Sequence, residues 1–126
     1  MNSIKVLTAI TSEIDEPSVA VAEVLSQLEL GKNQRKYSCG IIHCYSEAIE
    51  TGVIKALSDA LPFVTVGTTT TFNSSCGVHE TVQITVTVLT SDTAQFFGGV
   101  TESYANYTGN PAIKAFNSVK ATAGEA

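Results

Sequence analysis

Hydrophobic and polar residues alternate strictly from Val82 to Leu89, and this pattern predicts one of the longest strands of the chain. Val82, Ile84, Val86 and Val88 fall on one face of the strand, and Gln83, Thr85, Thr87 and Leu89 fall on the other. Successive side chains of a strand point to opposite sides of its sheet, so a period of two residues indicates one buried apolar face. After the turn at Thr90-Ser91-Asp92, we expect Phe96 to Thr101 to return as an antiparallel partner.

Three more apolar runs predict strands in the first half of the chain. Ile4 to Ile10 alternates with apolar residues on both faces, which is typical of a mostly buried strand. Ser38 to Tyr45 is apolar at its centre and carries almost no charge, so it predicts a second buried strand. Phe63 to Val66 is a β-branched and aromatic run that follows Pro62, and we expect Gly67 to end it.

Helical spacing of apolar residues predicts three helices, near residues 17 to 30, 46 to 61 and 111 to 120. Pro17 follows two acidic residues at the first helix start, and Gly31 is a natural stop at its end. The apolar stripes are Val21, Val24, Leu25 and Leu28 in the first helix, and Ile49, Val53, Ala56, Leu57, Ala60 and Leu61 in the second. We expect Gly52 to weaken the second helix only modestly, and the chain after Lys120 to fray.

The order of these elements predicts an α/β fold. Strands and helices alternate as β-α-β-α-β over the first half, which favours right-handed crossovers between neighbouring parallel strands. A β-hairpin and a C-terminal helix follow, so the sheet is expected to be mixed, with flanking helices. A chain of 126 residues fits one domain with a modest core, so we interpret residues 1 to 126 as a single domain.

Composition excludes several classes of partner. The net charge is −5 with only seven Lys and Arg residues, so a surface that follows nucleic-acid phosphates is not expected. No apolar stretch is long enough to span a bilayer, and the first ten residues contain no signal-peptide core, so we expect a soluble cytoplasmic protein without a membrane partner. The hydrophobic fraction of 44% is high for so small a chain and suggests that part of the surface is covered, most simply in a homo-oligomer.

The three cysteines, Cys39, Cys44 and Cys76, do not form a CxxC motif, so reduced thiols are expected and a disulfide framework is not. Cys76 and His79 lie three residues apart, but this spacing lacks the paired ligands of a zinc site, so neither a metal nor a cofactor is predicted. Cys76 could also act as a nucleophile with His79 or His43 as base. The absence of GxSxG and of a recognisable acid and base set makes a cysteine-dependent enzyme the third interpretation.

The segment after the strand at residues 63 to 66 is the candidate ligand site. It is rich in hydroxyls, and it directly follows a buried strand, where open α/β sheets commonly bind ligands. The candidate ligand-binding residues are Gly67, Thr68, Thr69, Thr70, Ser74, Ser75, Cys76 and Asp92. Gly67 would let the chain leave the strand with its amides inward, and Asp92 would orient the hydroxyls or meet a ligand amine. The alternatives are a solvated edge for the threonines and a turn cap for Asp92.

Several short motifs in this order resemble the N-terminal FIST domain, a sensory module of intracellular signal transduction in bacteria and eukaryotes. They are Glu13-Ile14-Asp15-Glu16-Pro17, Gly40-Ile41-Ile42, Ala60-Leu61-Pro62-Phe63, Val66-Gly67-Thr68-Thr69-Thr70 and Val88-Leu89-Thr90-Ser91-Asp92. The resemblance covers roughly Glu13 to Thr101. It departs from the family at Thr71-Phe72-Asn73, where a small residue, Gly and Glu are common, and the chain stops at Ala126, where members continue into a C-terminal FIST region.

The resemblance implies a small-molecule-binding sensory domain, with amino acids as the suggested ligand class. It also implies that the absent C-terminal FIST region is a natural partner, so a ligand site shared with that region would be incomplete here. The alternative from a different class is a structural or oligomerisation module without a ligand, in which the apolar excess marks an interface. Thermal unfolding against a panel of metabolites separates these two hypotheses, because a ligand of the folded state raises its stability.

Overall fold

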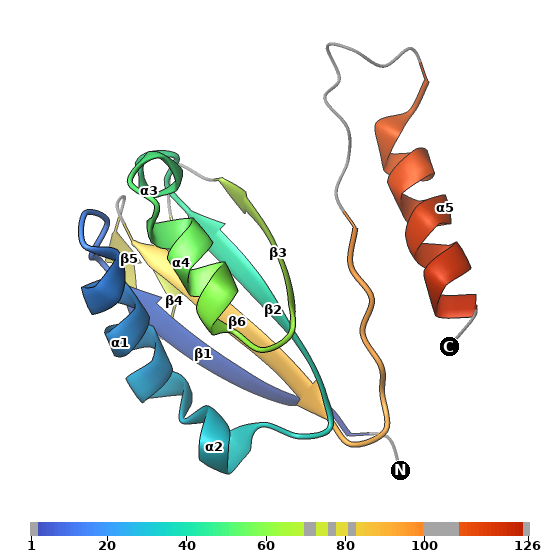
Figure 1. The fold of residues 1–126 in the computed structure, drawn as a ribbon, viewed down its shortest axis with the longest axis horizontal. Helices are drawn as coiled ribbons and strands as arrows, with labels where there is room; N and C mark the ends of the chain where they lie inside the picture. Colours follow the sequence, from blue (N-terminus) through green and yellow to red (C-terminus); the bar gives the residue numbers. More distant parts are fainter. Residues whose placement is uncertain (1–2, 70–72, 76–77, 81–82, 100–108, 125–126) are drawn as a thin grey trace. The chain divides into compact units, whose positions relative to one another are not determined.

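The computed structural model describes residues 3–69, 73–75, 78–80, 83–99 and 109–124. Contacts divide the chain into two compact units, Met1–Gln95 and Phe96–Ala126. The first unit contains β1 (Lys5–Thr11), α1 (Pro17–Leu28), α2 (Leu30–Asn33), β2 (Tyr37–Cys44), α3 (Glu47–Glu50), α4 (Val53–Ala60), β3 (Val64–Thr69), β4 (Asn73–Ser75), β5 (Val78–Glu80) and β6 (Ile84–Ser91), and the second contains α5 (Pro111–Gly124) (Figure 1).

The first unit is built on a mixed sheet of four strands in the order β1-β6-β2-β3. β2 and β3 are parallel, whereas β6 lies between β1 and β2 and is antiparallel to both. β4 and β5 form a separate antiparallel hairpin. These pairings, with flanking helices and a helix after the strands, confirm the predicted α/β class with a mixed sheet.

The strand order differs from the prediction in two respects. The alternating segment, β6, is the antiparallel strand, and it separates β1 from β2, so these two parallel strands are not neighbours. Residues 96–99 form no strand, so the expected antiparallel return at Phe96 to Thr101 is wrong in this part, and its last two residues lie outside the described residues. A local pattern predicts a strand, whereas its neighbours depend on contacts between distant segments.

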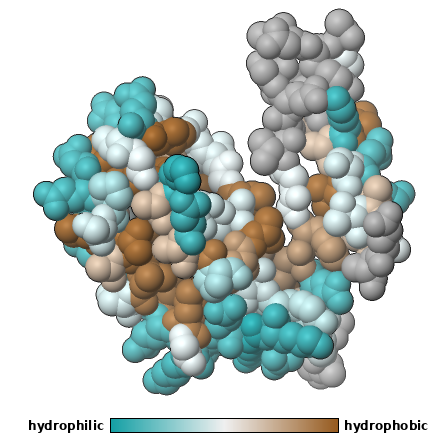
Figure 2. All heavy atoms as spheres, in the orientation of Figure 1, coloured by the Kyte–Doolittle hydropathy of each residue, from teal (hydrophilic) through white to brown (hydrophobic). Residues whose placement is uncertain are grey.

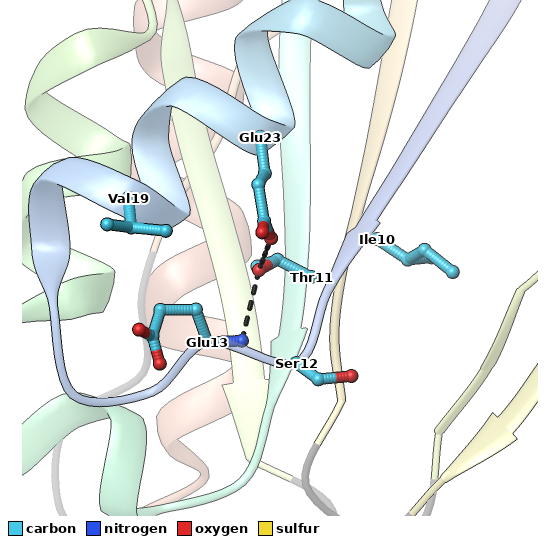
Figure 3. A pocket seen from close by; sticks show the side chains of 6 residues that line it. All are labelled: Ile10, Thr11, Ser12, Glu13, Val19 and Glu23. Atoms are coloured by element: carbon cyan, nitrogen blue, oxygen red, sulfur yellow. Dashed lines mark hydrogen bonds between the residues drawn. The ribbon is translucent and has the colours of Figure 1, made fainter.

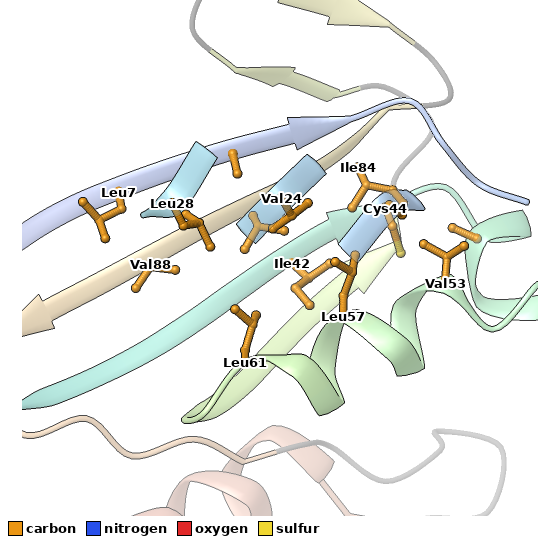
Figure 4. Close-up of a cluster of buried hydrophobic side chains, with 14 residues drawn as sticks. Leu7, Val24, Leu28, Ile42, Cys44, Val53, Leu57, Leu61, Ile84 and Val88 are labelled. Atoms are coloured by element: carbon orange, nitrogen blue, oxygen red, sulfur yellow. The ribbon is translucent and has the colours of Figure 1, made fainter. Parts of the chain in front are cut away.

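The hydrophobic core lies between one face of the sheet and helices α1 and α4 (Figure 4). The buried core residues are Leu7, Ala9, Ala20, Val24, Leu28, Ile42, Cys44, Ala48, Val53, Leu57, Leu61, Ile84, Val86 and Val88. Ile84, Val86 and Val88 are fully buried, which confirms the apolar face predicted for this strand. Val24 and Leu28 of the α1 stripe are buried with them, so the helical period correctly predicted which side of α1 packs.

The opposite face of the sheet carries a grid of twelve side chains that we call the outer face. Strand register aligns them in three rows: Val6, Leu89, Cys39 and Val64; Thr8, Thr87, Ile41 and Val66; Ile10, Thr85, His43 and Thr68. Val6 is 56% exposed, so the first strand is not mostly buried as predicted. Its face with Leu7 and Ala9 belongs to the hydrophobic core, whereas Val6 on the other face is exposed.

The helix ends also differ from the prediction. Gly52 adopts a left-handed conformation with φ of 86°, and it divides the expected helix at 46 to 61 into α3 and α4. The expected modest weakening is therefore a full break, which glycine makes without a Cβ penalty. α1 ends before Glu29, which has φ of 47°, rather than at Gly31. α5 continues to Gly124, so the expected fraying after Lys120 is wrong for residues 121–124.

The described residues of the candidate ligand-binding segment after residue 66 form strands. β3 continues through Gly67 to Thr69, and Ser74 and Ser75 belong to β4. Gly67 is paired with Ile42 of β2, and a Cβ at position 67 would lie 2.2 Å from the Ile42 carbonyl oxygen. The glycine is therefore needed for close approach of two backbones, and it does not end the strand.

Candidate functional site

Three strands end together at one end of the sheet. β1 and β2 both run antiparallel to β6, and β3 runs parallel to β2, so the carboxyl ends of β1, β2 and β3 lie at the same end. Thr11, Cys44 and Thr69 are the last residues of these strands. Ligands of α/β proteins commonly bind beyond such ends, so this end is where a site is expected.

The sequence-predicted residues of β3 lie near this end. Gly67, Thr68 and Thr69 are exposed, and the Thr68 hydroxyl donates to the Thr69 carbonyl oxygen at 3.4 Å. Ser74 and Ser75 are in the β4–β5 hairpin, where their backbones are paired with His79 and Val78. Thr70 and Cys76 lie outside the described residues.

Asp92 lies at the opposite end of the sheet. It directly follows β6, whose last residue, Ser91, is paired with Tyr37 at the start of β2. A strand of eight residues separates the two ends by about 25 Å at about 3.3 Å per residue. The structure therefore does not bring Asp92 to Thr68 and Thr69, because β6 runs in the opposite direction to β3.

The turn after β6 is capped by Ser91. Its hydroxyl oxygen accepts hydrogen bonds from the backbone N–H groups of Thr93 at 3.2 Å and Ala94 at 3.0 Å. The Asp92 carboxylate instead accepts a long bond of 3.4 Å from the backbone N–H of Lys36. Asp92 thus links the turn to the segment before β2, and the capping role suggested for it belongs to its neighbour.

A pocket lies at the carboxyl end of β1, between this strand, the following loop and α1 (Figure 3). It is lined by Ile10, Thr11, Ser12, Glu13, Val19 and Glu23 and has a volume of about 430 Å³. This volume lies within the range of roughly 300–1,000 Å³ that small-molecule sites have. The pocket is a shallow surface depression, so a ligand there keeps part of its own surface in water.

The Thr11 hydroxyl organises the polar side of the pocket. It donates to the Glu23 carboxylate at 2.5 Å and accepts the backbone N–H of Glu13 at 3.1 Å, as the dashed lines in Figure 3 show. Thr11 itself is only 3% exposed. A buried hydroxyl with two partners has little rotational freedom, so it holds the Glu23 carboxylate and the start of the loop in fixed positions.

Gln27 extends this arrangement along β1. Its side-chain oxygen accepts the backbone N–H of Ile10 at 2.9 Å, and its side-chain nitrogen donates to the Ile10 carbonyl oxygen at 2.7 Å. Val19, Glu23 and Gln27 recur every four residues on α1, so they lie on one side of the helix, facing the edge of β1. The helix therefore fixes both the pocket wall and the free edge of the sheet.

The pocket combines two carboxylates with hydroxyls and the aliphatic side chain of Val19. Glu13 and Glu23 supply negative charge, Thr11 and Ser12 supply hydroxyls, and no basic residue lines it. An ammonium group is the natural complement, because it donates several hydrogen bonds to carboxylate and hydroxyl oxygens. The aliphatic side chain of Val19, on the α1 wall, can contact the apolar part of such a ligand.

Reasoning from the sequence missed this pocket. Glu13 and Glu23 are ten residues apart, and no motif in the sequence relates them to each other. The four-residue spacing of Val19, Glu23 and Gln27 was the one available signal, since it places two polar residues on a helix face next to an apolar one. The periodicity of α1 does not show that these residues face the edge of β1, because that depends on where β1 lies in the fold.

The cysteines that the structure describes are poor nucleophiles. Burial raises the pKa of the Cys39 thiol, although a hydrogen bond with the Leu89 backbone lowers it in part, and burial also raises the pKa of Cys44. A raised pKa reduces the thiolate fraction at neutral pH. Cys76, the nucleophile of the third interpretation, lies outside the described residues. Within the part of the chain that is described, no group of three or more His, Cys, Asp or Glu side chains could hold a metal ion.

No protein-family model and no curated protein matches the chain. The resemblance to the N-terminal FIST domain therefore stays a prediction from short motifs. No helix among the described residues is long and apolar enough to cross a membrane.

Proposed function

We propose that the chain is a small-molecule-binding domain and that its ligand carries a cationic amine, held in the pocket at the carboxyl end of β1. The observation that carries the proposal is the carboxylate of Glu23, fixed by Thr11 and sharing a pocket with Glu13. A carboxylate that is already oriented loses little freedom when a ligand binds, and this favours affinity.

The proposed ligand class agrees with the sensory role that the FIST resemblance implies. Amino acids carry an ammonium group, which is the part that this pocket complements. The lining residues include no Lys or Arg, so the pocket offers no cation for a ligand carboxylate. We therefore expect diamines and basic amino acids to bind more tightly than acidic amino acids, and we propose that such binding regulates an intracellular signalling partner.

The first experiment measures thermal unfolding and calorimetric titration of the full chain with putrescine, lysine, glutamate and succinate. A ligand that binds only the folded state raises the melting temperature by mass action. We expect putrescine and lysine to raise it and the two acids to leave it unchanged. Equal stabilisation by glutamate, or no stabilisation by either amine, would contradict the proposal.

A set of variants then locates the site. Glu23→Gln and Glu13→Gln each remove one negative charge from the pocket, whereas Glu16→Gln removes a charge from the same loop region outside it. An ion pair at about 4 Å contributes about 1 kcal/mol even in water-like surroundings, so each pocket variant should weaken amine binding at least about 5-fold. The Glu16 variant should bind almost as tightly as the wild type.

Thr68 and Thr69 of β3 are the alternative location for the ligand site. They lie at the same end of the sheet, but β6 and β2 separate β3 from β1, which corresponds to about 14 Å at about 4.8 Å per strand. Replacing Thr68 and Thr69 together with valine removes two hydroxyls at nearly constant shape. Amine binding should survive this double change. If amine binding is lost in the double threonine variant and retained in the Glu23 variant, the site is at β3.

A further inference from the structure

The two edges of the four-stranded sheet are protected very differently. On the β1 edge, Gln27 occupies both the backbone N–H and the carbonyl oxygen of Ile10, so it takes the place of a neighbouring strand at that residue. β1 also carries a charged residue, Lys5. Charges and side chains that cover backbone groups are common means by which proteins prevent edge strands from pairing with other chains.

Within the first unit, the described residues give the β3 edge no comparable protection. β3 pairs with β2 on one side only, and Val64 to Thr69 contains neither a charged residue nor proline. The Thr65 hydroxyl is bonded to Ser58 of α4 at 2.7 Å, so it is directed to the core face and leaves the edge open. Figure 1 shows α4 inward of β3, over the sheet. A strand of this kind is ready to accept another.

Acidic and basic residues of the first unit gather at opposite ends of the strands. The acidic end of the sheet follows the carboxyl ends of β1 and β2, and it carries Glu13, Asp15, Glu16, Glu47 and Glu50. The basic end precedes β1 and β2, and it carries Lys5, Lys32, Arg35 and Lys36 against Glu29 and Asp92. Figure 2 shows hydrophilic residues at this basic end, around α2. The unit is therefore dipolar, although the whole chain is acidic.

We propose that two copies of this chain pair through β3, antiparallel, about a two-fold axis perpendicular to the sheet. Antiparallel pairing sets the acidic end of each copy beside the basic end of the other, which is the complementary arrangement. A parallel pairing would bring like ends together. Because Gln27 blocks the β1 edge at Ile10, addition stops at two copies and gives an eight-stranded sheet with β1 at both edges.

Symmetry also restricts the register to those centred on a residue of β3, and we propose the one that pairs the most outer-face residues. Residues directly opposite each other in an antiparallel pair share a face of the sheet, so outer-face residues must pair with outer-face residues. Val64, Val66 and Thr68 are the outer-face residues of β3. The register centred on Val66 pairs all three, with Val66 opposite its own symmetry copy and Val64 of each copy opposite Thr68 of the other.

The proposal is tested with two lysine variants that are matched in charge and face. Val66→Lys puts two ammonium groups side by side at the two-fold axis, whereas Val6→Lys adds the same charge to the outer face at the covered β1 edge. Light scattering and sedimentation of the full chain are measured between about 10 and 500 µM, because a contact between two short strands is small for a stable interface. Circular dichroism checks that each variant is folded.

We expect the wild type and Val6→Lys to be dimers at the upper concentrations, and folded Val66→Lys to be a monomer. Higher salt should weaken the wild-type dimer, since it screens the complementary ends. Should Val66→Lys not fold, Val66→Cys gives an independent test: under oxidation it should form a covalent dimer, and Val6→Cys should not. A wild-type monomer throughout the range, or a dimer unaffected by Val66→Lys, overturns the proposal.

Discussion

Replacing Gln27 with alanine tests how α1 protects the edge of the sheet. The change removes two hydrogen bonds at once, one accepted from the Ile10 N–H at 2.9 Å and one donated to the Ile10 carbonyl oxygen at 2.7 Å. It leaves the pairing of β1 with β6 in place, because the Ile10 N–H and carbonyl oxygen that bond Gln27 lie on the free edge of β1, on the side away from β6. The perturbation is therefore limited to one side-chain contact and the edge that it covers.

The expected loss of stability follows from the geometry. A net contribution of about 0.5–1.5 kcal/mol for each hydrogen bond gives about 1–3 kcal/mol for two. Gln27 is exposed, so water can replace the lost partners, which favours the lower limit of about 1 kcal/mol. Alanine has a higher helix propensity than glutamine by a few tenths of a kcal/mol. We expect a net destabilisation of about 0.5–1 kcal/mol, or a melting temperature about 2–6 °C lower.

Two measurements check this prediction. Urea unfolding gives the change in stability, with Gln34→Ala as the control, because Gln34 is also exposed but follows α2 and is not part of the α1 side that bonds Ile10. Sedimentation gives the assembly state. Opening the β1 edge provides a second strand for pairing, so the variant should form species larger than a dimer as the concentration rises.

Two results would refute this reasoning. A variant as stable as the wild type would mean that water replaces the two hydrogen bonds without cost. A less stable variant with an unchanged assembly state would mean that Gln27 supports the packing of α1 but does not protect the edge. The second result would also remove the argument that pairing through β3 stops at two copies.

The remaining predictions concern the strand contact at Gly67 and the buried thiols. Gly67→Ala would force a Cβ to within 2.2 Å of the Ile42 carbonyl oxygen, whereas nothing lies within 4 Å of a Cβ at Gly31. We expect urea unfolding to show a loss of several kcal/mol, or no folding, for Gly67→Ala and less than about 1 kcal/mol for Gly31→Ala. The raised pKa values of Cys39 and Cys44 mean that the unfolded chain loses its thiol protons at lower pH than the folded chain. Stability should therefore be complete below about pH 8 and fall as the pH rises above about 9, and the fall should be smaller when both cysteines are replaced by alanine. If the stability of the double variant falls as much as that of the wild type at high pH, groups other than Cys39 and Cys44 cause the pH dependence.

Local periodicity was sufficient to predict most of the elements. The alternation around Ile84, Val86 and Val88 identified both a strand and its face in the hydrophobic core, because neighbouring side chains of a strand necessarily point to opposite sides. The stripe with Val24 and Leu28 did the same for α1, since a helix repeats every 3.6 residues. The mixed α/β class followed from the order of these elements.

Tertiary structure decided the order of the strands and therefore which residues meet. β6 inserts between β1 and β2, and its direction carries Asp92 about 25 Å from Thr69, although both follow predicted strands. Pairing with Ile42 likewise gave Gly67 a place inside a strand, where its sequence context predicted a turn. The contact between Thr11 and Glu23 depends on the packing of α1 against β1. A pattern along the chain describes one element at a time, whereas a site is made by surfaces that only long-range packing brings together.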